Sequence, residues 1–239
     1  MVEKYNHTTA LHNLTAPREI VPLIMDVVQP ATVVDVGCGL GTFLRVFKES
    51  GVKEVTGIDG SWCKKELLFE NIRAEEFIEM DMEQRISLDR TYDLVVCLEV
   101  AEHLSPQRAD SFVEDLTRLG GVILFSAAVP RQGGVNHLNE QWLDYWEDKF
   151  NTHGFVMHDV LRPFLWENPK VFSYYKQNMV LFTKKDYIMK DDPRLVRNPL
   201  KNVIHPDMFS KRLDFRRKQA ARNYFKQFLL AVKYRLIKR

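Results

Sequence analysis

The segment Val33-Val-Asp-Val-Gly-Cys-Gly-Leu-Gly-Thr-Phe43 decides the fold. Its first four residues are mostly β-branched and predict a strand that ends just beyond Asp35. Gly37, Gly39 and Gly41 follow, and helical spacing begins after them. Glycine lets a ligand approach the backbone closely, and the free N–H groups at a helix start can face that ligand. The segment therefore predicts a ligand-binding turn between a strand and a helix.

Strands alternate with helical segments along the first three quarters of the chain, a pattern that predicts a parallel sheet. Two predicted strands, Tyr92–Leu98 and Gly121–Ala128, are almost continuously apolar, as strands are when helices cover both faces of the sheet. We expect seven strands: Thr32–Val36, Glu54–Asp59, Glu76–Met80, Tyr92–Leu98, Gly121–Ala128, Phe155–Leu161 and Asn178–Thr183.

The sequence divides into four parts around this sheet. Residues 1–30 are predicted to form a helical cap, in which Thr15 caps a helix with Pro17 in its first turn and Pro22 kinks or shortens it. Residues 31–183 form the ligand-binding domain. Residues 184–207 contain three prolines and predict a linker, and residues 208–239 predict a helical tail.

Composition and cysteine usage indicate a globular protein of the cytoplasm. Apolar residues make up 45% and charged residues 28% of the 239 residues, which is ordinary for a folded domain. No apolar run approaches the roughly 18 residues of a membrane span, and Met1–Arg18 lacks the features of a signal peptide. The three cysteines, Cys38, Cys63 and Cys97, form no C-x-x-C pair and are expected to be reduced thiols.

Asp35-x-Gly-x-Gly-x-Gly41 resembles the first motif of the class I S-adenosylmethionine-dependent methyltransferases. A dinucleotide-binding turn would instead need glycine at position 42, which is threonine, so NAD is disfavoured. The resemblance implies that the amino acid end of S-adenosylmethionine lies against this turn. The implied contacts are Asp35, Gly37, Cys38, Gly39 and Gly41.

The resemblance continues over residues 5–183. It implies that Asp59, followed by Gly60, binds the ribose hydroxyls of the cofactor, and that Asp81 and Met82 contact the adenine. The segment Tyr92–Leu104 resembles the fourth motif of the family and implies that Leu98 and Glu99 also lie at the cofactor. Gly120–Ser126 resembles the family's fifth strand. The implied fold is a doubly wound, Rossmann-like α/β sheet of seven mainly parallel strands with a final antiparallel hairpin.

Two kinds of methyl acceptor are disfavoured by the residues after the fourth predicted strand. Enzymes that methylate amino groups of nucleobases carry a polar-Pro-Pro-aromatic motif there, whereas this chain has Leu98-Glu-Val-Ala101. Methylation of cytosine carbon needs a nucleophilic cysteine beside a proline. Cys97 lies within an apolar strand and is expected to be a buried core residue.

The segment Val129–Trp146 follows the fifth predicted strand, where an open α/β sheet binds its ligands. It combines polar side chains with flat aromatic ones, which suits a polyhydroxylated acceptor. It resembles the corresponding loop of bacterial methyltransferases from polysaccharide and natural-product glycosylation pathways. We therefore expect O-methylation of a sugar hydroxyl, in a surface glycan or its lipid-linked precursor. The expected acceptor-binding residues are Arg131, Asn136, Asn139, Gln141, Trp142 and Tyr145.

Histidine is the expected general base, because a hydroxyl must lose its proton as it attacks the methyl group. His137 is the first candidate, although a histidine in this loop could instead cap a helix. Asn139 could likewise be the N-cap of a helix that Glu140 opens. His103 is the second candidate base. Glu99, Glu102 and His137 could bind a divalent ion, but their spacing matches no defined metal motif and none is predicted.

The tail differs from the rest of the chain in charge. Lys211–Arg239 carries a net charge of +10, and the remaining residues carry −8. Apolar residues recur along it at helical spacing: Ala221, Phe225, Phe228, Val232 and Leu236. Basic residues recur on another face: Lys218, Arg222, Lys226 and Lys233. This pattern predicts a basic amphipathic helix.

An anionic membrane surface is the expected partner of that tail, which would place the enzyme peripherally on the inner face of the membrane. Packing on the acidic body or across a homo-oligomer is an alternative, and nucleic acid is not expected. Two other functions stay open. A lipid or quinone headgroup would require a deeper, more apolar pocket, and an RNA methyltransferase would bind RNA with a steep dependence on salt.

Overall fold

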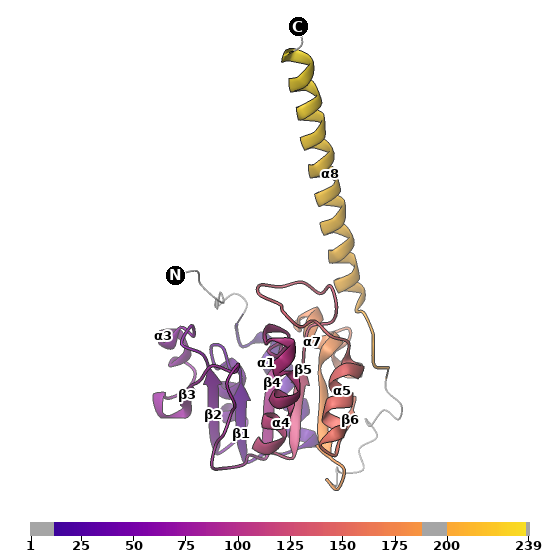
Figure 1. Ribbon diagram of the computed structural model, residues 1–239. Coiled ribbons are helices and arrows are strands. Elements are labelled where there is room, and N and C mark those ends of the chain that lie inside the picture. Colours follow the sequence, from indigo (N-terminus) through magenta and orange to yellow (C-terminus); the bar gives the residue numbers. More distant parts are fainter. Residues whose placement is uncertain (1–11, 188–199, 238–239) are drawn as a thin grey trace. The chain divides into compact units, whose positions relative to one another are not determined.

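A seven-stranded sheet forms the centre of the first of two units in the chain (Figure 1). The computed structural model describes residues 12–187 and 200–237. The first unit comprises residues 1–203 and the second residues 204–239. The strand order is β3-β2-β1-β4-β5-β7-β6, with β7 antiparallel to both of its neighbours. The predicted doubly wound α/β class and the antiparallel hairpin are therefore confirmed.

Two of the seven strands have the predicted bounds, and the other five differ at their ends. The observed strands are β1 Thr32–Val36, β2 Glu54–Asp59, β3 Phe77–Glu79, β4 Leu94–Leu98, β5 Val122–Ser126, β6 Phe155–His158 and β7 Val180–Lys184. Tyr92 forms only an isolated bridge to Gly120, so β4 begins later than predicted. Asn178 ends a helix and not a strand, so β7 begins later as well.

Helices cover both faces of the sheet. They are α1 Thr15–Val27, α2 Thr42–Glu49, α3 Lys65–Leu68, α4 Ala109–Leu119, α5 Leu143–Thr152, α6 Arg162–Leu165 and α7 Ser173–Asn178. The core of α1 and α2 includes Val33, whereas that of α4 and α5 includes Val34. Neighbouring residues of β1 therefore belong to different cores, because successive side chains of a strand point to opposite faces.

Helix α1 begins and continues differently from the prediction. Thr15 is its first residue, and Leu14 occupies the cap position. The Thr15 N–H donates a hydrogen bond to Oδ1 of Asn13 (2.8 Å), so asparagine supplies the capping oxygen. The helix runs through Pro22 to Val27 and is not shortened. Pro22 lies on the exposed side, where water can bond the backbone carbonyl that proline leaves unpaired.

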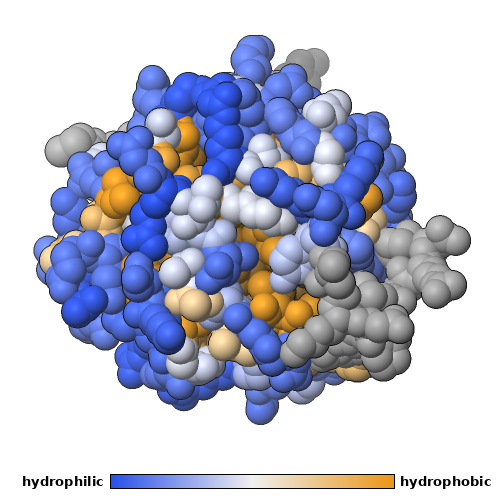
Figure 2. Space-filling view, turned by 90° about the horizontal axis from the view of Figure 1, so that it is seen from below, coloured by the Kyte–Doolittle hydropathy of each residue, from blue (hydrophilic) through white to orange (hydrophobic). Residues whose placement is uncertain are grey.

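The face at the amino ends of the parallel strands is mainly hydrophilic. Figure 2 shows this face from below, with apolar side chains confined to separate small areas. The strand order reverses between β1 and β4, because β2 pairs with one side of β1 and β4 pairs with the other. The carboxyl ends of these two strands lie at the opposite edge of the sheet. Ligands bind at this carboxyl edge in open α/β sheets. The fold thus indicates where the site lies.

The predicted linker is partly ordered against the first unit. Asn202 and Asp144 exchange hydrogen bonds (Nδ2 to Oδ2, 2.8 Å), and Lys201 forms an ion pair with Glu147 (Nζ to Oε2, 2.6 Å). Residues 188–199, with two of the three linker prolines, lie outside the described residues. The first unit therefore extends beyond the predicted boundary at residue 183.

The second unit contains the predicted tail helix, α8 Pro206–Ile237. The predicted basic amphipathic character of this helix stays a prediction. Phe209 and Leu213 are exposed and lie off the predicted apolar stripe. The side chains of Phe225, Phe228, Val232 and Leu236 lie outside what the structure describes. No helix in the described part of the chain combines the length and apolar character of a membrane span.

Candidate active site

A cavity of about 490 Å³ opens at the carboxyl ends of β1, β2 and β4. Its size is in the range of small-molecule sites in proteins. Most of the residues predicted at the cofactor line it, together with both candidate bases. These residues are Asp35, Gly37, Cys38, Gly39, Asp59, Asp81, Met82, Leu98, Glu99, His103 and His137.

The glycine turn between β1 and α2 has the backbone that the sequence predicts. Gly37, Gly39 and Gly41 have φ angles of 82°, 55° and 71°, which residues with a side chain rarely adopt. A Cβ atom at Gly37 would also lie 2.3 Å from the side chain of Val100. Gly41 does not line the cavity, but its positive φ contributes to the conformation of the turn. The turn therefore requires glycine for both conformation and space.

Two buried carboxyl groups lie beside this turn. Asp59 accepts hydrogen bonds from the N–H groups of Gly39 (to Oδ2) and Gly60 (to Oδ1), both at 2.7 Å. Gly60 acts through this backbone bond and does not line the cavity. Burial raises the pKa of Asp59, although these two hydrogen bonds oppose the shift. Burial, and then the charge of Asp59, raise the pKa of Asp35 to about 8.

The Asp35→Asn substitution should remove a pH dependence from the stability of the ligand-free protein. Folded Asp35 keeps its proton up to about pH 8, whereas an unfolded aspartate ionises near pH 4. The free energy of unfolding should therefore fall by up to about 1.4 kcal/mol per pH unit between these values. Urea denaturation at pH 5 to 8 measures this slope in the parent and the variant. The exposed Asp81→Asn variant is the control, and equal slopes in parent and Asp35→Asn would contradict the assignment.

The loop between β5 and α5 is fastened to the turn that follows β4. The N–H groups of Leu138 and Asn139 donate to the backbone oxygen of Glu102 (2.8 and 2.9 Å). Nδ1 of His103 lies 3.3 Å from the backbone oxygen of Asn136. These contacts bring the rings of His103 and His137 together edge to face, with 4.7 Å between their centroids. The two candidate bases therefore lie next to each other at the cavity.

Glu140 holds His137 and was not predicted as a functional residue. Its Oε1 lies 2.9 Å from Nδ1 of His137, and its two oxygens also accept the N–H groups of Arg131 and Gly133. Partial burial raises the pKa of Glu140, but these hydrogen bonds outweigh it and lower the pKa below its usual value. An ionised Glu140 fixes the proton of His137 on Nδ1 and leaves the lone pair on Nε2. The spacing His137-x-x-Glu140 is the only sequence signal for this pair.

The six predicted acceptor-binding residues do not line the cavity. Asn139 is buried and accepts a hydrogen bond from Gln141, while Tyr145 packs against Trp146. The structure also places Trp142, not Asn139, at the N-cap of α5. From this segment, the cavity is lined by Gln132, Gly133, Val135 and His137. The remaining predicted residues, Arg131 and Asn136, are exposed at positive φ.

A second set of residues that sequence reasoning missed joins the loop to Glu99. Gln132 donates from Nε2 to Oε2 of Glu99 (2.7 Å), and Asn178 donates from Nδ2 to Oε1 (3.0 Å). Burial raises the pKa of Glu99, against these bonds. Tyr174 and Tyr175 from α7 complete this side of the cavity. Glu99 therefore connects the end of β4 to both the loop and α7.

The cysteines play no chemical role that the structure supports. Cys38, Cys63 and Cys97 are free, as predicted, and all three are buried. Burial raises the pKa of all three thiols, so none is primed as a nucleophile. Cys97 is completely buried, which further disfavours covalent attack by its thiol.

This fold and site define a Rossmann-like, S-adenosylmethionine-dependent methyltransferase. The chain belongs to the methyltransferase-domain family, whose model matches residues 12–162. Malonyl-[acyl-carrier protein] O-methyltransferase of Pectobacterium atrosepticum is 30% identical over 135 residues, which are 54% of this chain. The match spans 50% of that relative's length.

Solved methyltransferases share the fold at low sequence identity. PKMT2 of Rickettsia typhi, in complex with AdoHcy, has a TM-score of 0.54 and 13% identity, covering 74% of this chain and 55% of that one. Magnesium protoporphyrin IX methyltransferase of Synechocystis, with bound SAM, has a TM-score of 0.51 and 18% identity, covering 71% and 78%. Human N-acetylserotonin methyltransferase, in complex with SAM, has a TM-score of 0.50 and 16% identity, covering 70% and 51%.

The lining residues fit S-adenosylmethionine chemically. Two buried carboxyl groups, Asp35 and Asp59, line the cavity and could accept hydrogen bonds from ammonium and hydroxyl groups, and the glycine turn leaves no side chain in the way. Met82 is buried beside the exposed Asp81 and offers an apolar surface to a flat ring. When bound, this cofactor supplies an electrophilic methyl group. The residues of the chain orient it and act on the acceptor.

Proposed function

We propose that the protein methylates a hydroxyl group of a sugar, in a surface glycan or its lipid-linked precursor. The observation that carries this proposal is the Glu140–His137 pair beside His103 at the cavity. A hydroxyl ionises far above neutral pH, so its methylation needs a group that acts on its proton. Imidazole titrates near neutral pH and suits that task.

The charges at this end of the cavity favour a neutral acceptor. Glu83, Glu99 and Glu102 all line the cavity, and Glu102 lies beside the two histidines. In their ionised form, these carboxyl groups would repel a carboxylate, which is the acceptor that the name of the Pectobacterium relative indicates. A hydroxyl group carries no charge, and sugar hydroxyls can donate hydrogen bonds to carboxyl groups. The glutamates therefore support a polyhydroxylated substrate over an acidic one.

A lipid or small-molecule headgroup is the second candidate acceptor. Val135 lines the cavity and is 62% exposed, so an apolar side chain stands at the opening. Phe172, Tyr174 and Tyr175 add aromatic surface inside. These residues could pack on the apolar part of a lipid, and equally on the flat face of a sugar ring.

A transfer assay with radiolabelled S-adenosylmethionine tests these acceptors together. The purified protein is incubated with separated glycan, lipid and RNA fractions of cells, and label is counted in each. We expect label in the glycan or lipid-linked glycan fraction, in alkali-stable ether linkage. Label in simple lipids would favour the second candidate, and label in RNA would overturn both.

We also propose that α8 attaches the enzyme to an anionic membrane surface. The tail segment Lys211–Arg239 has a net charge of +10, and α8 exposes Phe209 and Leu213. Basic residues near an anionic surface contribute about 1 kcal/mol each, and apolar side chains add a contribution that resists salt. This location would suit an acceptor that is linked to lipid.

Ending the chain at Val203 should abolish membrane binding and leave cofactor binding intact, because all described cavity-lining residues precede this point. Co-sedimentation with vesicles of phosphatidylglycerol measures the first effect, and calorimetry with S-adenosylhomocysteine the second. Vesicles of phosphatidylcholine are the control. Equal sedimentation of the full-length and shortened proteins would remove the membrane proposal. RNA binding or dimer formation that is lost in the shortened protein would assign α8 another partner.

A further inference from the structure

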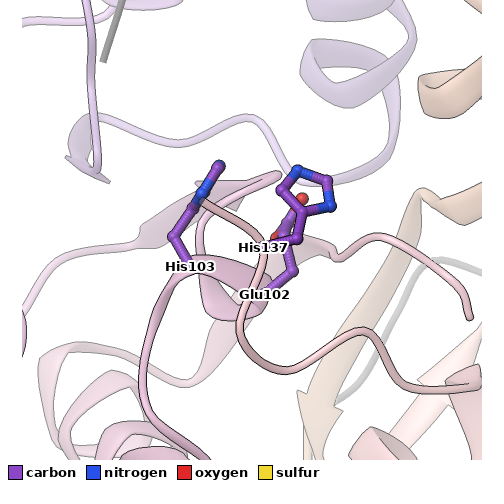
Figure 3. A group of neighbouring side chains, drawn as sticks. All are labelled: Glu102, His103 and His137. Atoms are coloured by element: carbon purple, nitrogen blue, oxygen red, sulfur yellow. The ribbon is translucent and has the colours of Figure 1, made fainter. Parts of the chain in front are cut away.

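Three side chains that commonly bind metal ions meet at the acceptor end of the cavity. Glu102 and His103 come from the 3₁₀ turn Ala101–His103 that follows β4, and His137 comes from the loop after β5 (Figure 3). One ligand atom from each lies within 4.8 Å of the other two. Atoms bonded to one ion at about 2.1 Å lie within about 4.2 Å of each other. A small closing movement would therefore complete a three-residue site.

The carboxyl group of Glu102 indicates a missing partner. Its side chain is fully buried, and neither oxygen has a hydrogen-bond partner among the described residues. A buried polar group without a partner is costly, and buried carboxylates are normally paired or bound to metal ions. In Figure 3 the carboxyl group points toward the ring of His137. A cation between these side chains would satisfy it.

Oxygen atoms face Nδ1 of both histidines in the cluster. Nδ1 of His137 faces the Glu140 carboxylate, and Nδ1 of His103 faces the backbone oxygen of Asn136. Because both oxygens accept hydrogen bonds, each Nδ1 acts as the donor. Histidines that bind metals usually donate their other ring N–H to a carboxylate or carbonyl in this way. The surroundings of the cluster thus match those of metal-binding histidines.

We propose that Glu102, His103 and His137 bind a divalent first-row transition-metal cation at the acceptor end of the cavity. Two imidazoles with one carboxylate suit Mn²⁺ or Zn²⁺ better than Mg²⁺ or Ca²⁺, which prefer oxygen ligands. Three protein ligands leave coordination positions open to the acceptor. The inference rests on the proposed function in one respect: an acceptor hydroxyl bound to the cation would be acidified by it and would release its proton to solvent, so that His137 would hold the cation and would not itself take the proton.

The test is binding of the metal alone to the full-length protein. Protein stripped with a chelator is titrated with Mn²⁺, and the free ion is followed by electron paramagnetic resonance, with Zn²⁺ calorimetry in parallel. We expect one ion per chain. His103→Ala and Glu102→Gln should weaken binding by about 100-fold or more, since loss of an outer partner alone costs 10- to 100-fold. His153→Ala, an exposed histidine outside the cluster, is the matched control.

The outcomes separate this inference from the proposed function. Absence of Mn²⁺ and Zn²⁺ binding to the stripped parent would overturn the cation site, as would parent-like binding by both cluster variants. S-adenosylhomocysteine binding shows that each variant is folded. If methyl transfer to glycan persists in excess chelator, the proposed function is supported and the reaction does not require the cation. If the parent binds one Mn²⁺ per chain and the variants do not, the cation site is supported. If the same parent transfers no methyl group to glycan, the proposed acceptor is overturned.

Discussion

The His137→Ala variant should lose about 10²- to 10⁴-fold in kcat while keeping its affinity for the cofactor. The substitution removes the nitrogen that acts on the acceptor hydroxyl, directly or through a cation, and that interaction matters in the transition state. Initial rates at saturating S-adenosylmethionine measure kcat, and calorimetry with S-adenosylhomocysteine measures affinity. His153→Ala should behave as the parent.

The Glu140→Gln variant also tests the role of His137 in acting on the acceptor hydroxyl. Glutamine keeps an acceptor oxygen but lacks the charge that holds the Nδ1 proton of His137. We expect a smaller loss of kcat than for His137→Ala, with unchanged cofactor affinity. Near-full turnover by His137→Ala would contradict the assignment and move the role to His103.

The Asp59→Ala variant should bind the cofactor about 1.5–3 kcal/mol more weakly, or roughly 10- to 150-fold. The substitution removes a charged acceptor for the ribose hydroxyls. It also removes the hydrogen bonds that Asp59 accepts from Gly39 and Gly60, which shape the glycine turn. Calorimetry with S-adenosylmethionine gives the dissociation constant directly.

Asp59→Asn separates these two contributions, because asparagine keeps one acceptor oxygen but not the charge. Its affinity should fall between those of the parent and Asp59→Ala. The exposed Asp81→Ala variant serves as a comparison at the other carboxylate predicted to contact the cofactor. Parent-like affinity in Asp59→Ala would show that the end of β2 does not contact the cofactor.

The cofactor side of the site could be predicted from sequence because strand ends fix it. Asp35 and Asp59 occupy neighbouring strands that pair in parallel, so their carboxyl groups reach the same edge of the sheet. The glycine turn is likewise a local feature, set by residues adjacent in sequence. Errors in the strands are confined to their ends, as at Tyr92 and Asn178, where pairing with distant segments decides.

The acceptor side depends on contacts that sequence spacing does not reveal. The backbone oxygen of Glu102 fastens residues 138 and 139, and this contact decides which way each loop side chain turns. Asn139 is thereby buried, while His137 reaches the cavity. Tyr145 packs against Trp146, its neighbour in α5, and does not line the cavity. A loop whose conformation is set by tertiary hydrogen bonds cannot be predicted from its composition.

The fastening of the loop between β5 and α5 also bears on how an acceptor would be captured. Hydrogen bonds to Glu102, Glu99 and Glu140, all within the protein itself, hold this loop. Ordering a backbone residue costs about 1–2 kcal/mol of conformational entropy. Here that cost is incurred when the protein folds, so the incoming molecule meets a surface that is already arranged. Affinity for the acceptor should then reflect the contacts themselves, and association should not wait for a slow rearrangement of the loop.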